Sequence, residues 1–268
     1  MTPVSTVLVT GATGGIGAAV VGALLQAGHA VLATGRDAAA LEQLRQRYPS
    51  DQARLSTLPA DLANADDLQA VVAHARDWCG GVDVLINNAG CSLFGQLGSQ
   101  SPEAVSRVVE LNLIVPMILT QALLPTLRRH FRAHVINVGS VFGAIGYAGN
   151  VAYCASKFGL RGMTEALRRE LADTNIQVHL VAPRATRTTM NEGAVDALNL
   201  ELGNQVDSPE QVAEIILRRL ETGSGNRVIG FPECFFARLN AVFPSMVDRA
   251  LHRQLPIIQR HANSRSHS

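Results

Sequence analysis

A tyrosine and a lysine four residues apart are the side chains in this sequence best placed to do chemistry. Tyr153 and Lys157 lie in the segment VAYCASKFGL, and Lys157 is the only lysine among 23 Lys and Arg residues. At this spacing both side chains lie on one face of a helix. A phenol donates or accepts protons, and a nearby ammonium favours its ionised form. The pair predicts acid–base chemistry, with an ordinary helix-surface pair as the alternative.

A second chemical motif is the glycine-rich segment VLVTGATGGIGAAVVGAL near the start of the chain. It runs from a predicted strand into a predicted helix, whose free N–H groups and positive dipole end attract phosphates. Gly11 allows a tight turn, while Gly15 and Gly17 let the backbone approach a pyrophosphate. The motif predicts a dinucleotide site, and the flanking elements disfavour the alternative of a simple strand-to-helix turn.

The segment ATGRD at the end of the second predicted strand bears on cofactor choice. An NAD site has a ribose-binding carboxylate about 20 residues after the glycine motif. Here Gly35 takes that position and Arg36 follows it, so a guanidinium is placed to bind the 2′-phosphate of NADP. The alternatives are that Arg36 is a solvated charge or that Asp37 reaches the ribose. The predicted cofactor is NADP(H).

Aliphatic runs that alternate with helix-length segments must position these motifs. The strand candidates are 4–10, 30–35, 53–58, 82–88, 133–140, 176–183 and 226–230. Such alternation is typical of a parallel sheet with helices on both faces. We expect one catalytic domain over residues 1–230, an amphipathic helical extension over 231–260 and a disordered end over 261–268.

Composition limits the class of protein. With 268 residues, 47% hydrophobic residues and a formal charge of +1, the chain is typical of a soluble protein with one core and gives no case for nucleic-acid binding. Four widely spaced cysteines without a C-x-x-C pair, and no secretory leader, favour a cytoplasmic protein without a metal site. The apolar run at 111–127 is shorter than the roughly 20 residues of a membrane span, so we expect a buried or subunit-contacting helix.

Several further motifs occur in order: TGATGGIG at 10–17, AD at 60–61, NNAG at 87–90, Asn112 in LNL, Ser140 in NVGS and YCASK at 153–157. Together they resemble the short-chain dehydrogenase/reductase family over residues 4–230. The resemblance implies a Rossmann-type, doubly wound α/β fold with a seven-stranded parallel sheet. It also implies a nicotinamide cofactor and a homodimer or homotetramer formed through the helices around 101–130 and 150–173.

The resemblance assigns a catalytic tetrad to this chain. Tyr153 is expected to be the general acid, and Lys157 to lower its pKa and bind the ribose. Ser140 is expected to orient the carbonyl, and Asn112 to hold a water that links the lysine to solvent. The residues expected at the cofactor are Gly11, Thr13, Gly14, Gly15, Ile16, Gly17, Arg36, Asp61, Leu62, Asn88, Ala89, Gly90, Tyr153, Lys157, Pro183, Thr186 and Thr188.

One segment departs from the family pattern. The family usually has Pro-Gly after the sixth strand, whereas APRATRTTMN places Arg184 at the glycine position. Pro183 and Thr188 still match. Arg184 or Arg187 either contacts a cofactor phosphate or an acidic substrate group, or faces solvent.

The substrate side is expected to be mostly apolar. Candidate pocket residues are Leu93, Phe94, Val141, Phe142, Ile145, Tyr147 and Met190, and the predicted substrate contacts are Ser140, Phe142, Tyr147, Tyr153 and Met190. We therefore expect an NADPH-dependent oxidoreductase for an apolar carbonyl or alcohol, such as a ketone, steroid, retinoid or 3-oxoacyl thioester. A non-catalytic nucleotide-sensing or scaffold protein is the alternative, which the complete tetrad disfavours.

The segment from residue 231 onward is apolar, aromatic and basic, with five arginines against two acidic residues. Such a segment lies on a membrane surface or covers a lipid-like substrate. Alternatively, its apolar stripe packs against its own domain or a partner subunit.

Overall fold

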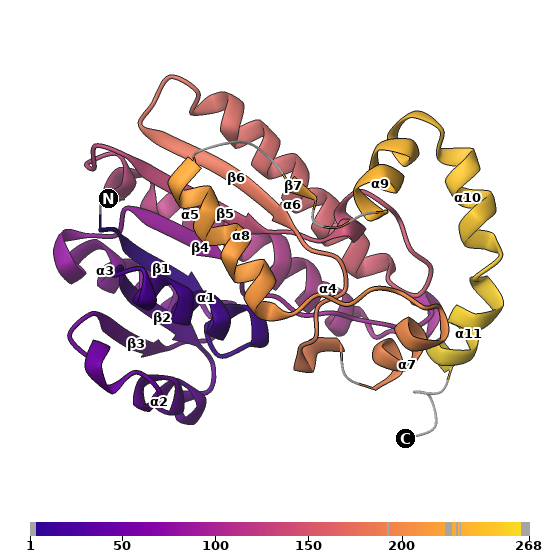
Figure 1. Ribbon diagram of the computed structural model, residues 1–268, viewed down its shortest axis with the longest axis horizontal. Coiled ribbons are helices and arrows are strands. Elements are labelled where there is room, and N and C mark those ends of the chain that lie inside the picture. Colours follow the sequence, from indigo (N-terminus) through magenta and orange to yellow (C-terminus); the bar gives the residue numbers. More distant parts are fainter. Residues whose placement is uncertain (1–3, 192, 223–226, 229, 231, 264–268) are drawn as a thin grey trace.

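The strands of the protein form one parallel sheet in the order β3-β2-β1-β4-β5-β6-β7 (Figure 1). A computed structural model describes residues 4–191, 193–222, 227–228, 230 and 232–263. The strands are β1 (Thr6–Thr10), β2 (Ala30–Gly35), β3 (Leu55–Pro59), β4 (Val84–Asn87), β5 (Ala133–Val138), β6 (Ile176–Ala182) and β7 (Arg227–Val228). Six strands have four or more residues, whereas β7 is a two-residue pairing with the end of β6. The expectation of seven full strands is therefore met only in part.

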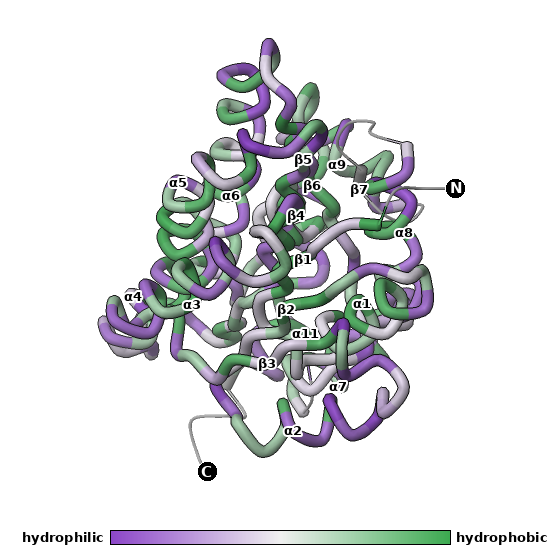
Figure 2. The backbone as a smooth tube through the Cα atoms, turned by 90° about the vertical axis from the view of Figure 1, so that its left-hand side faces the viewer, coloured by the Kyte–Doolittle hydropathy of each residue, from purple (hydrophilic) through white to green (hydrophobic). Residues whose placement is uncertain are grey.

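Helices cover both faces of the sheet, as Figure 2 shows from the side. The α-helices are α1 (Gly15–Gln26), α2 (Ala38–Gln46), α3 (Ala65–Asp77), α4 (Pro102–Val109), α5 (Val115–Leu127), α6 (Val151–Glu170), α7 (Ala194–Glu201), α8 (Pro209–Thr222), α9 (Glu233–Val242), α10 (Pro244–His252) and α11 (Leu255–Asn263). Helices α1, α2 and α8 pack on one face, and α3, α5 and α6 pack on the other. The predicted doubly wound architecture is confirmed.

The central strand β1 shows why its sequence is apolar at successive positions. Val7 and Val9 point into the core beneath α1 and α8, and Leu8 points into the opposite core. All three side chains are 0% exposed. Successive side chains of a strand point to opposite faces of the sheet. Because helices cover both faces, these three successive positions are all buried and apolar.

Residues Pro102–Leu127 form one continuous 26-residue helix, which contains an 18-residue stretch with a mean hydropathy of 1.7. By length and composition alone this helix is able to cross a membrane, so the expectation of a run too short to do so is wrong. It is longer because α4 joins α5 through a π-helical turn at Glu110–Ile114. Leu119, Leu123 and Leu127 are 0% exposed beneath the sheet, and this burial accounts for the apolar composition.

The end of the chain forms helices α9, α10 and α11 beside the carboxyl edge of the sheet (Figure 1). We call these three helices the C-terminal cap. Pro244 begins α10, where a missing N–H costs no helical bond. Residues 261–263 were expected to be disordered but continue α11. Residues 264–268 lie outside the described residues, and the proposed domain boundaries stay a prediction.

The inner face of the C-terminal cap packs on the rest of the domain. Ala237 and Val247 pack with Val141 and Ile145. Ile258 at the far end of the cap packs with a second apolar cluster around Phe94 and Leu198. One of the two alternatives for this segment, packing against its own domain, is therefore observed.

Candidate active site

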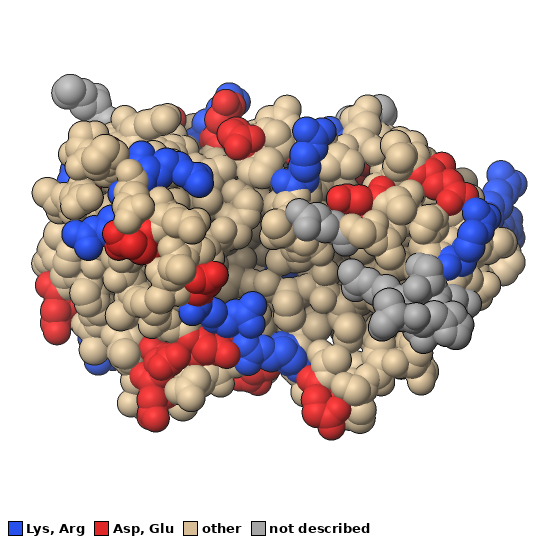
Figure 3. All heavy atoms as spheres, turned by 90° about the horizontal axis from the view of Figure 1, so that it is seen from below, with Lys and Arg blue, Asp and Glu red and all other residues tan. Residues whose placement is uncertain are grey.

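A cleft of about 540 Å³ opens where the strand order reverses, between the carboxyl ends of β1 and β4. Ligands of doubly wound sheets bind at this point, because the connections leave β1 and β4 toward opposite faces. Figure 3 shows the surface hollowed near the middle of the molecule. Every residue predicted at the cofactor lines the cleft, namely Gly11, Thr13, Gly14, Gly15, Ile16, Gly17, Arg36, Asp61, Leu62, Asn88, Ala89, Gly90, Tyr153, Lys157, Pro183, Thr186 and Thr188.

The glycine-rich turn leaves the start of α1 open to a ligand. Gly11 has a φ of 63°, which glycine adopts without strain. Helix α1 begins at Gly15 with no side-chain cap and no acidic residue in its first turn. Its first N–H groups have no partner within the helix, so they are available to phosphate oxygens. A Cβ on Gly15 would lie 2.7 Å from Cγ2 of Thr188, so a larger residue would displace this wall of the cleft.

The donors along the cleft fit an anionic dinucleotide. Arg36 and Lys157 line it together with the free N–H groups of α1. Two hydrogen bonds from Nη2 of Arg107, 2.8 and 2.9 Å long, engage the Asp61 carboxylate. Burial raises the pKa of Asp61, but the bonds from Arg107 and from the backbone of Ala63 outweigh this and lower it. The hydrogen-bond donors and positive charges that a phosphate needs are therefore supplied by Arg36, Lys157 and the start of α1.

Asp37, the alternative ribose ligand, has another role in this structure. Its carboxylate accepts a 3.0 Å hydrogen bond from the N–H of Ala40 and so begins α2. Asp37 does not line the cleft, whereas the neighbouring Arg36 does.

Three of the four predicted catalytic side chains meet on the wall of the cleft. Ser140 follows the end of β5, and Tyr153 and Lys157 lie one turn apart on α6. The Ser140 side chain acts on the Tyr153 phenol by lowering its pKa, and its Oγ accepts a 3.2 Å hydrogen bond from the N–H of Phe142. The Nζ atom of Lys157 lies 5.8 Å from the centre of the Tyr153 ring and donates a 3.0 Å bond to the carbonyl of Val138. The helix-surface alternative for this pair is excluded because Lys157 is 6% exposed.

Asn112 lies behind this wall in the π-helical turn of Glu110–Ile114. It is 0% exposed. Its Oδ1 accepts from the N–H of Cys91, and its Nδ2 donates to the carbonyl of Cys91 and to Oγ of Ser156. These contacts fix the Cys91 backbone beside the lysine. Asn112 is thus a buried amide with its oxygen and nitrogen both bonded, while the water relay stays a prediction.

Burial controls the acidity of the catalytic pair. It raises the pKa of Tyr153 to about 12, although the Ser140 side chain acts in the opposite direction. Burial also lowers the pKa of Lys157 to about 8. Desolvation therefore dominates in the chain by itself, and the lowering expected from the Lys157 ammonium beside an oxidised nicotinamide stays a prediction. The phenol therefore holds its proton throughout the neutral pH range.

A second cavity, of about 310 Å³, lies beyond Tyr153 and Ser140, which line both spaces. The predicted residues Phe94, Val141, Phe142, Ile145 and Tyr147 line it. Two other candidates do not. Met190 lines the nucleotide cleft instead, and Leu93 lines neither space. The second cavity therefore has the largely apolar wall expected of a substrate pocket, and its role in binding substrate stays a prediction.

The C-terminal cap closes this pocket, which the sequence did not predict specifically. The pocket residues that sequence reasoning missed include Val195 and Leu198 of α7, and Phe236, Val247, Ala250, Leu251 and Gln254 of the cap segment. The hydroxyl of Tyr147 donates a 3.1 Å bond to Oε1 of Gln254. The Tyr147 ring stacks on Phe142 with their centres 4.8 Å apart. The only signal in the sequence was the apolar stripe of the tail.

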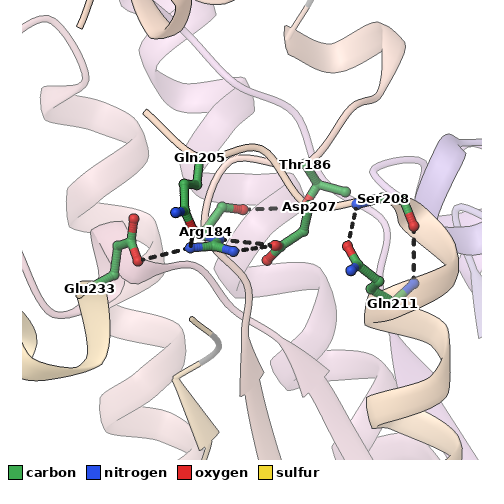
Figure 4. Close-up of polar contacts among 7 residues, drawn as sticks. All are labelled: Arg184, Thr186, Gln205, Asp207, Ser208, Gln211 and Glu233. Atoms are coloured by element: carbon green, nitrogen blue, oxygen red, sulfur yellow. Dashed lines mark hydrogen bonds and ion pairs between the residues drawn. The ribbon is translucent and has the colours of Figure 1, made fainter. Parts of the chain in front are cut away.

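Arg184, which takes the place of the family's usual glycine, joins three segments (Figure 4). Its guanidinium donates two bonds to Asp207, of 2.9 and 2.6 Å, and one of 2.6 Å to Gln205. A longer contact of 3.4 Å reaches Glu233 at the start of α9. The bond to Asp207 raises the pKa of Arg184, although burial opposes it.

This network excludes the solvent-facing alternative for Arg184. Its side chain is 14% exposed and paired with carboxylates of this chain, and it lines both the cleft and the second cavity. Arg187 is exposed. Gly230, with a φ of 94°, lies directly against Arg184, and a Cβ there would come within 2.9 Å of Cδ. Arg184 therefore connects the loop after β6 to the C-terminal cap.

Comparison with known proteins agrees with this geometry. The family model described as short chain dehydrogenase matches residues 5–199. The chain is 34% identical over 238 residues to dehydrogenase/reductase SDR family member 7B of Bos taurus, covering 84% of this chain and 73% of the relative. It is 33% identical over 220 residues to a 3alpha-hydroxysteroid dehydrogenase of Mediterraneibacter gnavus, covering 78% and 87%.

A solved structure shares the fold over nearly the whole chain. It is a short-chain dehydrogenase from Sphingobium yanoikuyae in complex with NADPH. The TM-score is 0.77 at 26% identity, with 91% of this chain and 96% of the other covered.

Proposed function

The chain belongs to the short-chain dehydrogenase/reductase family of oxidoreductases, and from this premise we propose that it is an NADPH-dependent reductase of apolar carbonyl compounds. One observation carries the proposal: Ser140 and Tyr153 line both the nucleotide cleft and the apolar pocket. A proton donor at this junction reaches a carbonyl that enters from the pocket while the cofactor lies in the cleft.

The choice of NADPH rests on the charges near the second strand. Arg36 is exposed on the rim of the cleft, and no carboxylate occupies the preceding position, Gly35. Asp37 is engaged at the start of α2. A guanidinium binds a phosphate monoester through paired hydrogen bonds, whereas a ribose diol needs an acceptor. The NADPH complex of the similar structure from Sphingobium yanoikuyae supports the same choice.

Each catalytic residue on the wall of the cleft has a separate role in the proposed reaction. When bound, the nicotinamide supplies the hydride. Tyr153 donates the proton of its hydroxyl to the carbonyl oxygen, and its raised pKa keeps that proton in place until charge develops. The Ser140 hydroxyl donates a hydrogen bond to the same oxygen, a contribution worth roughly 2.7–4 kcal/mol for a preorganised donor. Lys157, held by the carbonyl of Val138, places an ammonium beside the phenol and the ribose position.

The pocket favours an apolar substrate over a sugar or an acid. Its wall consists mainly of aliphatic and aromatic side chains such as Val141, Phe142 and Leu198. Arg184 is the positively charged residue on its lining, and it is already paired with Asp207 and Glu233. A ketone, steroid, retinoid or 3-oxoacyl thioester fits this chemistry, and the Mediterraneibacter gnavus relative is named for a hydroxysteroid.

We also propose a homodimer or homotetramer, which is typical of the family. The helices expected to form the contacts carry exposed apolar side chains. Met117 and Ile118 on α5 are 44% and 42% exposed, and Val151 and Phe158 on α6 are 45% and 42% exposed. Size-exclusion chromatography with light scattering measures the mass directly. A monomer at micromolar concentration would contradict this assembly.

A substrate screen tests the proposed activity. NADPH oxidation is followed by absorbance with apolar ketones, aldehydes, steroids and acyl thioesters, and the Tyr153→Phe variant is the matched control. We expect turnover of at least one apolar class by the wild type only. Binding of NADPH without turnover of any substrate class would favour the nucleotide-sensing alternative, because the cleft would then bind the cofactor without catalysing a reaction.

A further inference from the structure

The outer face of α9 and α10 exposes large apolar side chains in a short stretch of the chain. Phe235, Val242, Phe243 and Met246 are 53%, 66%, 54% and 56% exposed. We call these four residues the outer cap face. Phe235 and Val242 are two helical turns apart and so share one side of α9, and Phe243 continues this side into the corner before α10. Single exposed apolar residues are common, but a contiguous patch marks an interaction site.

Basic residues flank the outer cap face. Arg238, Arg249 and Arg253 are exposed, and no carboxylate among the described residues pairs with any of them. The nearby acids are Asp248, which is exposed, and Glu233, which is bonded to Arg184. At the right-hand end of the molecule in Figure 3, basic side chains lie at the outer edge with acidic side chains beside them.

We propose that the outer cap face docks on an anionic lipid bilayer. Aromatic and aliphatic side chains flanked by arginines suit the interface between acyl chains and anionic headgroups. A second copy of the chain suits this face less well, because a two-fold contact would bring the same arginines together from both subunits. The positive charge beside the outer cap face therefore favours an anionic bilayer over a second copy of the chain.

The two faces of the cap give the docking a structural consequence. Phe236, Val247 and Leu251 on the inner side line the apolar pocket, while the outer cap face meets the bilayer. The pocket and the membrane are thus separated by one layer of helix. Delivery of an apolar substrate from the bilayer through this layer rests on the proposed function, whereas docking itself does not.

Vesicle flotation of the full-length protein tests the docking. The probes are vesicles of phosphatidylcholine alone and of phosphatidylcholine mixed with phosphatidylglycerol. We expect flotation with the anionic vesicles, weaker at high salt because headgroup attraction is screened. Phe243→Glu combined with Met246→Glu should weaken binding by about tenfold or more, because charge would have to enter the apolar layer.

The matched control is Phe131→Glu, which makes the same change at a side chain that is 102% exposed outside the C-terminal cap. This variant should float like the wild type. Phe243 and Met246 line neither the cleft nor the pocket, so NADPH binding shows that the double variant is folded. Failure of the wild type to float, or equal flotation of the double variant, would overturn the proposal. Loss of an oligomer in the double variant without any vesicle binding would assign the face to a subunit contact instead.

Discussion

The nucleotide cleft and the capped pocket meet at Tyr153, yet they are built in different ways. The cleft is built around a glycine turn, the open start of α1 and the ends of neighbouring parallel strands. The pocket is made of side chains from distant segments, such as Tyr147 and Gln254, which are 107 residues apart. Cofactor binding is therefore encoded in short motifs, while substrate binding depends on how the end of the chain folds back.

The largest effect is expected where the two regions meet. Tyr153→Phe removes the proton donor but keeps the ring against Phe142, which lies edge-on to it at 6.4 Å. We expect kcat to fall by roughly 10²–10⁴-fold, the range for loss of a general acid. The dissociation constant for NADPH, measured by fluorescence titration, should change little. Turnover near the wild-type rate would remove Tyr153 from the mechanism.

The second largest effect belongs to the cleft side. The pKa of Lys157 is lowered to about 8, so its charge is lost as pH rises through that value. If the ammonium is required, kcat/KM for NADPH should fall above about pH 8, while Tyr153, with a pKa of about 12, stays protonated. Lys157→Arg keeps a charge at all these pH values but is wider than the buried site, so we expect a loss on the order of 10²-fold without the alkaline decline.

An unchanged alkaline decline in the arginine variant would assign that titration to another group. A near-normal rate in the same variant would show that the position needs only a positive charge.

A third substitution acts on the nucleotide cleft and leaves the pocket unchanged. Arg36→Asp replaces a phosphate-binding charge with a ribose-binding carboxylate. We expect the ratio of kcat/KM for NADPH to that for NADH to fall by about 10–100-fold, with the KM for the carbonyl substrate unchanged. The exposed Arg47, directly after α2, offers a control, because Arg47→Asp makes the same charge change outside the cleft. An unaltered ratio in the Arg36 variant would show that another residue selects the cofactor.

The smallest kinetic effect is expected from the cap side. Arg184→Ala leaves Asp207, which is 6% exposed, without its guanidinium partner. Unfolding free energy in denaturant should fall by about 2–4 kcal/mol, and the KM for the carbonyl substrate should rise several-fold, while NADPH affinity is kept. Arg187→Ala, an exposed arginine of the same loop, is the matched control. A larger loss of NADPH affinity than of substrate affinity would place Arg184 with the cofactor.

The elements of the fold were predictable because their signals are local. Alternation of apolar runs predicted the parallel sheet, and the glycine spacing predicted the turn before α1. The sequence prediction was least accurate for β7, because its two paired residues are too few to show an apolar pattern. The π-helical turn at Asn112 was not predictable, since it extends one helix into another without a break in the apolar periodicity.

The parts of the site that lie in short sequence motifs were predictable, and the parts that depend on distant residues were not. All expected cofactor residues line the cleft, because most of them follow a strand end that the sheet brings to one edge, and Tyr153 and Lys157 lie on α6 beside it. Arg184 was identified as unusual, but its partners Asp207 and Glu233 lie 23 and 49 residues away. The rise that burial produces in the pKa of Tyr153 was not predicted, because sequence reasoning counted the charge of Lys157 and not the desolvation of the phenol.

The contact between Arg184 and Gly230 makes glycine necessary at position 230 for two separate reasons. Arg184 passes over this glycine, whose Cβ, if present, would lie 2.9 Å from the arginine side chain. The backbone at 230 also has a φ of 94°, which residues other than glycine rarely adopt. A redesign of the cap that shortens residue 184 removes the first obstacle and keeps the second, so position 230 has to stay glycine.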